Sequence, residues 1–103
     1  MANEEQVKIL KQGAETWNKW REENRDVKPD LYRADLSEAN LSEANLIEAN
    51  LEGANLEGAN FYRADLTGAD LTGVDLREAK NLTQEQIDSA ITDEDTKLPD
   101  DLK

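Results

Sequence analysis

The sequence predicts a single-domain, all-β solenoid whose coils are built from bent five-residue units and whose two ends are covered by helices. Three observations predict this fold. A five-residue repeat runs from Asp30 to Lys80, an Asp or Asn lies between a small and a large apolar residue in successive units, and segments with helix signals flank the repeat. At 103 residues the chain is long enough for one such domain, residues 1–103.

Residues 3–24 are predicted to form an N-terminal capping helix. The segment begins with a favourable N-cap residue, and at about 100° per residue its apolar side chains share one wide face. Three large residues of this face, Leu10, Trp17 and Trp20, are expected to cover the first coil. We interpret the two tryptophans as part of this cover rather than as an aromatic binding platform, and Gly13 as a point of close approach to the coil.

The repeat, residues 30–80, supplies one large apolar residue in every unit and a small one two residues before it. These side chains are predicted to fill the inside of the solenoid. The large residues are Leu31, Leu36, Leu41, Leu46, Leu51, Leu56, Phe61, Leu66, Leu71 and Leu76. The small residues are Ala34, Ala39, Ala44, Ala49, Ala54, Ala59, Ala64, Ala69 and Val74.

A period of five fits no regular element, so every unit must contain a bend. On an α-helix, a residue every five positions advances by about 500°, and the leucines would spiral around the surface. On a continuous strand, alternate leucines would face opposite sides. We therefore expect the small residue, the Asp or Asn and the large residue to point in, out and in along one side of a coil. The next two residues turn the corner, where a glycine such as Gly58 favours the turn.

The repeated unit also resembles a known family. Two examples of the unit are Ala34-Asp35-Leu36-Ser37-Glu38 and Ala69-Asp70-Leu71-Thr72-Gly73. Repeated over about half of the chain, this unit resembles that of the pentapeptide repeat family. The resemblance implies a right-handed quadrilateral parallel β-helix with four units per coil, and so about 2.5 coils over residues 30–80.

The charge pattern tests the number of units per coil only in part. Two units per coil would stack Glu38 on Glu48, and like charges directly opposite one another are unfavourable. Three and four units per coil both avoid such pairs. The square cross-section is therefore an expectation from the resemblance alone.

Residues 81–103 are predicted to form the C-terminal cap. A capping box begins at Thr83, and Leu82 with Ile87 makes a hydrophobic staple around the start of a short helix. This helix is expected to end near residue 91 and to bring together Ile87, Ala90 and Ile91. The segment also resembles the tail of family members, so we expect the chain to be complete.

The composition gives little support for catalysis or for metal binding. The chain has no Cys and no His, which removes thiolate metal ligands and the commonest general base. The acids recur on a surface that we expect to be convex, where a solvated charged face is the simplest interpretation. The acidic cluster Asp93–Asp95 is interpreted as a turn. We therefore expect no catalytic residue, no cofactor-binding residue and no metal ligand, and hence no enzyme.

The charge of the chain indicates the kind of partner that it could bind. The formal net charge is −12. Residues 30–80 carry eleven acids and four bases, and residues 81–103 carry seven acids and two bases. Such a surface excludes direct nucleic-acid binding and favours a protein partner with a cationic surface.

Two functions are consistent with these features. We expect a non-enzymatic scaffold or protein-interaction module. The alternative is an acidic DNA mimic that binds a DNA-binding enzyme such as a topoisomerase, a role that the resemblance implies for some family members. Two covered ends predict a monomer. No apolar run approaches about 18 residues and no secretory signal is visible, so we expect no membrane contact and a cytoplasmic location.

Overall fold

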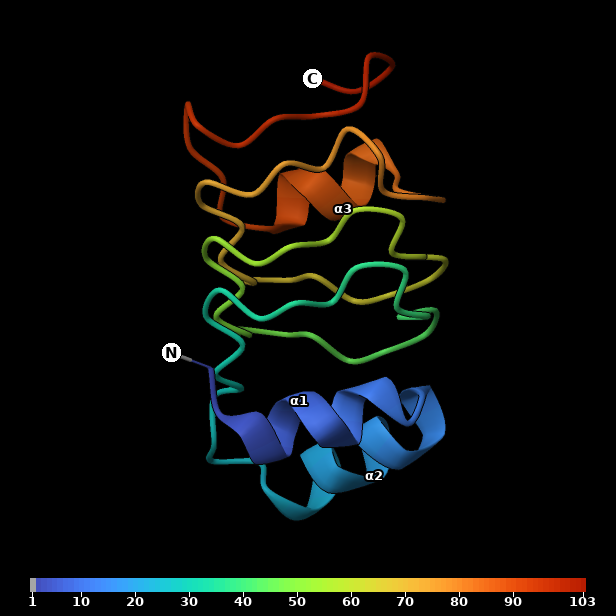
Figure 1. The fold of residues 1–103 in the computed structure, drawn as a ribbon, viewed down its shortest axis with the longest axis vertical. Helices are drawn as coiled ribbons and strands as arrows, with labels where there is room; N and C mark the ends of the chain where they lie inside the picture. Colours follow the sequence, from blue (N-terminus) through green and yellow to red (C-terminus); the bar gives the residue numbers. More distant parts are fainter. Residues whose placement is uncertain (1) are drawn as a thin grey trace.

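A stack of bent coils has helices across one end and the C-terminal segment at the other (Figure 1). The computed structural model describes residues 2–103 and contains α1 (Glu4–Lys11), α2 (Ala14–Glu23) and α3 (Gln84–Ser89). The molecule measures 36 × 24 × 22 Å. Helices α1 and α2 cover one end of the stack, and the C-terminal segment lies at the other end.

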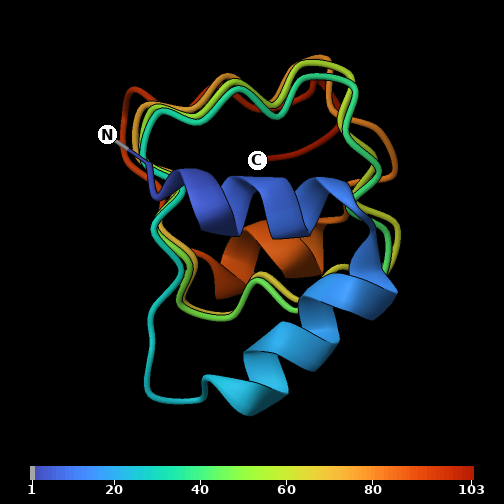
Figure 2. The same cartoon turned by 60° about the horizontal axis from the view of Figure 1, so that its bottom comes forward.

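Single parallel bridges join the coils, and their register gives the size of one coil. Within the repeat every bridge links residues twenty positions apart, as in Asp30 with Asn50 and Asn50 with Asp70. One coil therefore contains four five-residue units, and three units per coil are excluded. Seen from the helical end, the coils superpose around a common outline (Figure 2).

The fold is a solenoid, but its sides are too short to form regular strands. Each bridge stands alone because a corner follows every three residues. Residues at the second corner position, such as Arg33 and Glu38, have φ near +60°, the left-handed region that a tight turn uses. Most β-type pairing in the repeat is thus one residue wide, so within residues 2–103 the predicted all-β solenoid is a stack of bent coils joined by single bridges.

The interior is filled by the two apolar series of the repeat. The large residues from Leu31 to Leu76 are all buried, with Phe61 fully enclosed. The small series is also buried apart from Ala39, which is only partly buried. Ala39 was expected in the core, and its exposure shows that the covering helices do not extend over this part of the first coil.

The N-terminal cap consists of two helices, so the prediction of one helix over residues 3–24 is wrong. Gly13 separates α1 from α2 with φ 112° and ψ 167°, a conformation that is essentially confined to glycine. A Cβ atom at Gly13 would meet no other atom within 4 Å, so the expected close approach to the coil is wrong as well. The break lets α1 cross the mouth of the solenoid while α2 follows its edge (Figure 2).

The C-terminal segment completes the third coil in addition to covering it. Helix α3 begins with the expected capping box at Thr83 and ends at Ser89. Beyond the helix, Ile91 bridges to Asp70 and Lys97 bridges to Asp75. Ile91 is 54% exposed, so its expected packing beside Ile87 is wrong. The backbone of the third coil needs hydrogen-bond partners, and the chain supplies them by leaving the helix early.

Helices α2 and α3 lie against the same side of the solenoid, at opposite ends. Asn45 and Asp65 form one bridge on this side. Trp17 of α2 donates to the carbonyl oxygen of Asn45, and Gln86 of α3 donates to the carbonyl oxygens of Phe61 and Ala64. Side chains of the two helices thus bind the backbone of the coils above and below this bridge. Over residues 2–103, no helix is long and apolar enough to cross a membrane.

Candidate functional site

The outward-facing Asp and Asn residues form ordered columns along the sides of the solenoid. Each side-chain Oδ1 accepts a hydrogen bond from the backbone N–H two residues later, as in Asp35 with Ser37 and Asn55 with Glu57. Asp35 also accepts from the Ser37 hydroxyl at 2.7 Å. This hydroxyl, together with the Ser37 backbone N–H, lowers the pKa of Asp35. These bonds fix the turns and hold the polar groups in place on the surface.

The columns keep like charges apart along the stack. On one side Asn50 bridges to both Asp30 and Asp70. A neutral amide therefore separates two carboxylates, which would repel each other at the spacing of adjacent coils. The outer surface is therefore acidic, but in this column no two carboxylates lie on adjacent coils.

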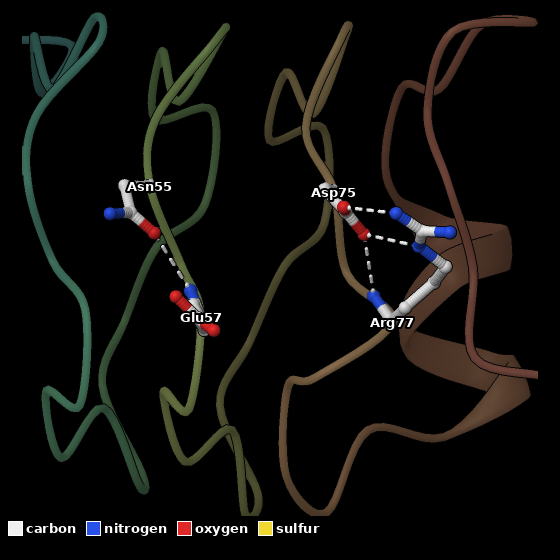
Figure 3. Close-up of polar contacts among 4 residues, drawn as sticks. All are labelled: Asn55, Glu57, Asp75 and Arg77. Atoms are coloured by element: carbon white, nitrogen blue, oxygen red, sulfur yellow. Dashed lines mark hydrogen bonds and ion pairs between the residues drawn. The ribbon is translucent and has the colours of Figure 1, made fainter.

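One side of the third coil carries an ion pair (Figure 3). Arg77 Nη2 lies 2.8 Å from Asp75 Oδ2, and Arg77 Nε donates to Asp75 Oδ1 at 3.0 Å. The hydrogen bond from the Arg77 side chain, followed by that from its backbone N–H, lowers the pKa of Asp75 to about 2. Both side chains are about half exposed, so this pair contributes little to stability.

The ladder between the second and third coils is interrupted beside this ion pair. Within residues 2–103 no bridge joins Asn55 to Asp75, although the neighbouring sides keep theirs. The N–H of Gly58 instead donates to the carbonyl oxygen of Glu78. A cavity of about 210 Å³ opens here. We attribute the missing bridge to Val74, which lies on this side of the coil and is larger than the alanines found elsewhere in the same series.

The N-terminal cap satisfies the backbone of the first coil on two of its four sides. On the first side, the Asn3 N–H donates to the Asp30 carbonyl oxygen at 2.9 Å, and Gln6 Oε1 accepts from the Asp30 N–H. On the second side, Arg21 and Asn18 hold the backbone of Asn45. Burial is the main cause that lowers the pKa of Arg21.

The other two sides of the first coil are open at this end. Among residues 2–103, none forms a hydrogen bond with the backbone N–H or C=O of Asp35 or Asn40. Ala39 lies between them and is partly exposed, whereas Ala59, one coil further, is fully buried. We call residues 34–44 the open rim.

A groove adjoins the open rim. It has a volume of about 450 Å³ and lies between α1 and the start of the rim. Val7 and Ala34 provide apolar lining, while Lys11 and Arg33 are the basic residues beside it. The guanidinium of Arg33 lies over the ring of Tyr32 at 5.4 Å.

The arrangement presents charge and backbone groups rather than a catalytic constellation. The pKa of Asp35 and of Asp75 is lowered, so both carboxylates stay ionised at neutral pH. In the part of the chain that the structure describes, no group of three or more acidic side chains is placed to hold a metal ion. Such a surface can attract cations and pair with a backbone, whereas acid–base catalysis needs groups with separated pKa values.

The cap residues lie as a cover over the first and last coils. Leu10, Trp17 and Ile87 are buried, and Trp20 and Leu82 are half-buried against the core. The rings of the two tryptophans stack with centroids 5.1 Å apart. The aromatic pair therefore belongs to the packing of the lid.

Two features of this surface were missed by the sequence analysis. The open rim has no local signal, because units with a covered edge and units with a free edge share the same residue pattern. The interrupted ladder did have a signal, namely the valine at a position that otherwise holds alanine.

Comparison with models of protein families identifies the repeat. The model described as pentapeptide repeats (8 copies) matches residues 30–68 and 44–80. Neither the curated proteins nor the solved structures contain a match to this chain.

Proposed function

The chain belongs to the pentapeptide repeat family, and on this premise we propose that it is a scaffold or protein-interaction module folded as a right-handed quadrilateral β-helix. Proteins with these repeats are generally non-enzymatic structural or interaction modules. The proposal includes a monomer in the cytoplasm whose partner carries a cationic surface.

The observation that carries this proposal is the ordered acidic surface. Residues 30–80 carry eleven acids and four bases, and hydrogen bonds hold the outward Asp side chains in fixed positions, as at Asp35 and Asp65. The ordered Asp carboxylates attract a positively charged protein surface without a large entropic cost for ordering their own side chains.

Affinity capture from the native cell extract tests the proposal. The bait is the whole chain, and the matched control is the same chain with Glu52→Gln, Glu57→Gln and Asp65→Asn, which removes three charges and keeps the shapes. We expect a discrete protein that is retained at low salt, is released at high salt, and is retained less by the control. Saturable turnover of a small molecule in a metabolite screen would contradict the proposal.

The second candidate is the acidic DNA mimic, and the charge density favours it. Together with residues 81–103, which have a net charge of −5, the repeat extends an acidic surface along a molecule 36 Å long. A net charge of −12 over 36 Å is about one charge per 3 Å, which is of the same order as the one charge per about 1.7 Å of axis in duplex DNA. If the chain mimics DNA, it inhibits supercoiling by a topoisomerase at low salt and loses this effect at high salt. Supercoiling that is unaffected by excess protein would remove this candidate.

A further inference from the structure

We propose that the open rim binds an extended, basic peptide segment of a partner protein, whose backbone adds to the first coil as a further strand. This inference rests on the proposed function, because it assigns a place and a chemistry to the interaction. Backbone addition to a free sheet edge is a recurrent mode of peptide recognition.

The backbone groups of the open rim already have the geometry for pairing. One coil further, the Asn55 N–H donates to the Ala34 carbonyl oxygen and the Asn55 carbonyl oxygen accepts from the Leu36 N–H, both at 2.9 Å. Asp35 occupies the same position in the first coil as Asn55 does in the second. Its own N–H and C=O are therefore directed away from the stack, and so are those of Asn40. Free groups of this kind are a template for another chain.

The protein itself shows what occupies such an edge. On the adjacent side of the same coil, Asn3 has an extended backbone, with φ −76° and ψ 110°. Its N–H donates to the carbonyl oxygen of Asp30 at 2.9 Å. A single extended residue, the N-cap of α1, thus donates one backbone hydrogen bond to this edge, and the open rim offers two further positions of the same type.

The charge of the open rim selects a basic segment. Residues 34–44 contain the acids Asp35, Glu38 and Glu43 and no Lys or Arg. All three acids are exposed. Beside them the groove along α1 offers the apolar surface of Val7 and Ala34. Lys11 and Arg33 also line this groove, so we expect the basic side chains of the segment to lie on the other side of it, toward Glu38 and Glu43. An extended segment with basic side chains on one face and small apolar side chains on the other matches both features.

A pair of synthetic peptides tests the proposal. The probe is a short peptide in which lysine alternates with valine, and its partner is the same peptide with alternate backbone amides methylated. We expect the unmodified peptide to slow hydrogen exchange at the amides of Asp35 and Asn40, as followed by NMR. The methylated peptide keeps the charge but loses backbone donors, so we expect weaker binding and no such protection.

Charge variants provide the matched controls. The test variant is Glu38→Lys with Glu43→Lys, and the control is Glu78→Lys with Glu94→Lys, which changes the net charge equally at the third coil and the C-terminal segment. We expect the test variant to bind the lysine–valine peptide about tenfold more weakly than the control variant does. If the lysine substitutions impair folding, Glu38→Gln with Glu43→Gln replaces them, and circular dichroism verifies the fold.

The outcomes separate this inference from the proposed function. Protection of Asp35 and Asn40 together with the stated order of affinities supports the open rim as the site. Binding that perturbs another face and leaves these amides unprotected overturns this inference and leaves the interaction module standing. If neither the lysine–valine peptide nor any cationic protein binds the chain, both proposals are wrong.

Discussion

Individual residues of the repeat show why its pattern is so regular. Every large residue faces inward because the small-Asx-large sequence alternates along a side that is only three residues long. Leu56 is 1% exposed, although it borders the interrupted ladder. The core assignment of such residues follows from the period alone, whereas their exposed neighbours vary freely in charge and size.

We expect Leu56→Ala to lower the free energy of unfolding by about 2–5 kcal/mol, because it removes buried methyl groups and leaves a cavity. Urea denaturation followed by circular dichroism measures the loss. Ile91→Ala is the control, since Ile91 is half exposed, and we expect a loss of less than about 0.5 kcal/mol. An unchanged midpoint for Leu56→Ala would contradict its inward position.

The Asp75 carboxylate has a lowered pKa that makes its contribution to stability depend on pH. Its pKa of about 2 lies below its ordinary value of 3.8, because Arg77 donates hydrogen bonds to it. A carboxyl whose pKa is lowered on folding stabilises the folded state above the ordinary value and loses this effect as the pH falls toward the lower one. The contribution of Asp75 is therefore present at neutral pH and disappears between about pH 4 and pH 2.

In Arg77→Ala we expect the pKa of Asp75 to rise toward 3.8, since the side-chain hydrogen bond is its largest cause of lowering. An NMR titration of the side-chain carboxyl carbon measures this. Asp35 is the internal control, because Ser37 rather than Arg77 lowers its pKa. Equal shifts at both carboxyls would mean that a general effect, and not the ion pair, is responsible.

At the scale of elements, the sequence predicted the caps but not their division. The apolar face of residues 3–24 continues through Gly13, so periodicity alone indicates one helix. The structure breaks the helix there because Trp17 and Arg21 must reach the edge of the first coil at Asn45. These contacts are made with the repeat, and the periodicity of residues 3–24 contains no information about them.

Gly13→Ala distinguishes one continuous helix over residues 3–24 from two helices divided at Gly13. In a continuous helix, replacing glycine by alanine stabilises by about 1 kcal/mol. In the structure Gly13 has φ 112°, so we expect the change to lower the free energy of unfolding by about 1–3 kcal/mol. Thermal denaturation gives the sign of the effect, and stabilisation would mean that the two helices are one.

The start of the C-terminal helix could be predicted from the sequence, but its end could not. Thr83 begins a capping box in both the sequence and the structure, because the signal depends on neighbouring residues only. The end of the helix was placed too late, since Ile91 pairs with Asp70 across the coil. Bridges between residues far apart in sequence carry no local signature.

For the whole molecule, we expect a monomer of 11.6 kDa in sedimentation at both low and high salt. Helices α1 and α2 lie at one end of the stack, which they cover except at the open rim, and the C-terminal segment lies at the other end (Figure 1). A net charge of −12 makes copies repel each other. High salt is the control, because it screens this repulsion. A dimer at high salt alone would show that charge, and not the covered ends, keeps the copies apart.

The bent five-residue unit, the inward and outward faces, the acidic surface and the presence of two caps can all be predicted from the repeat and its flanking segments. Each of these follows from a pattern repeated within a few residues, where packing and turn chemistry act locally. Three further features are visible only once the chain is folded: twenty residues make one coil, the N-terminal cap is divided at Gly13, and Asp35 and Asn40 keep free backbone groups. These features depend on which distant segment reaches which edge, and backbone hydrogen bonding between distant segments is the same for almost any side chain.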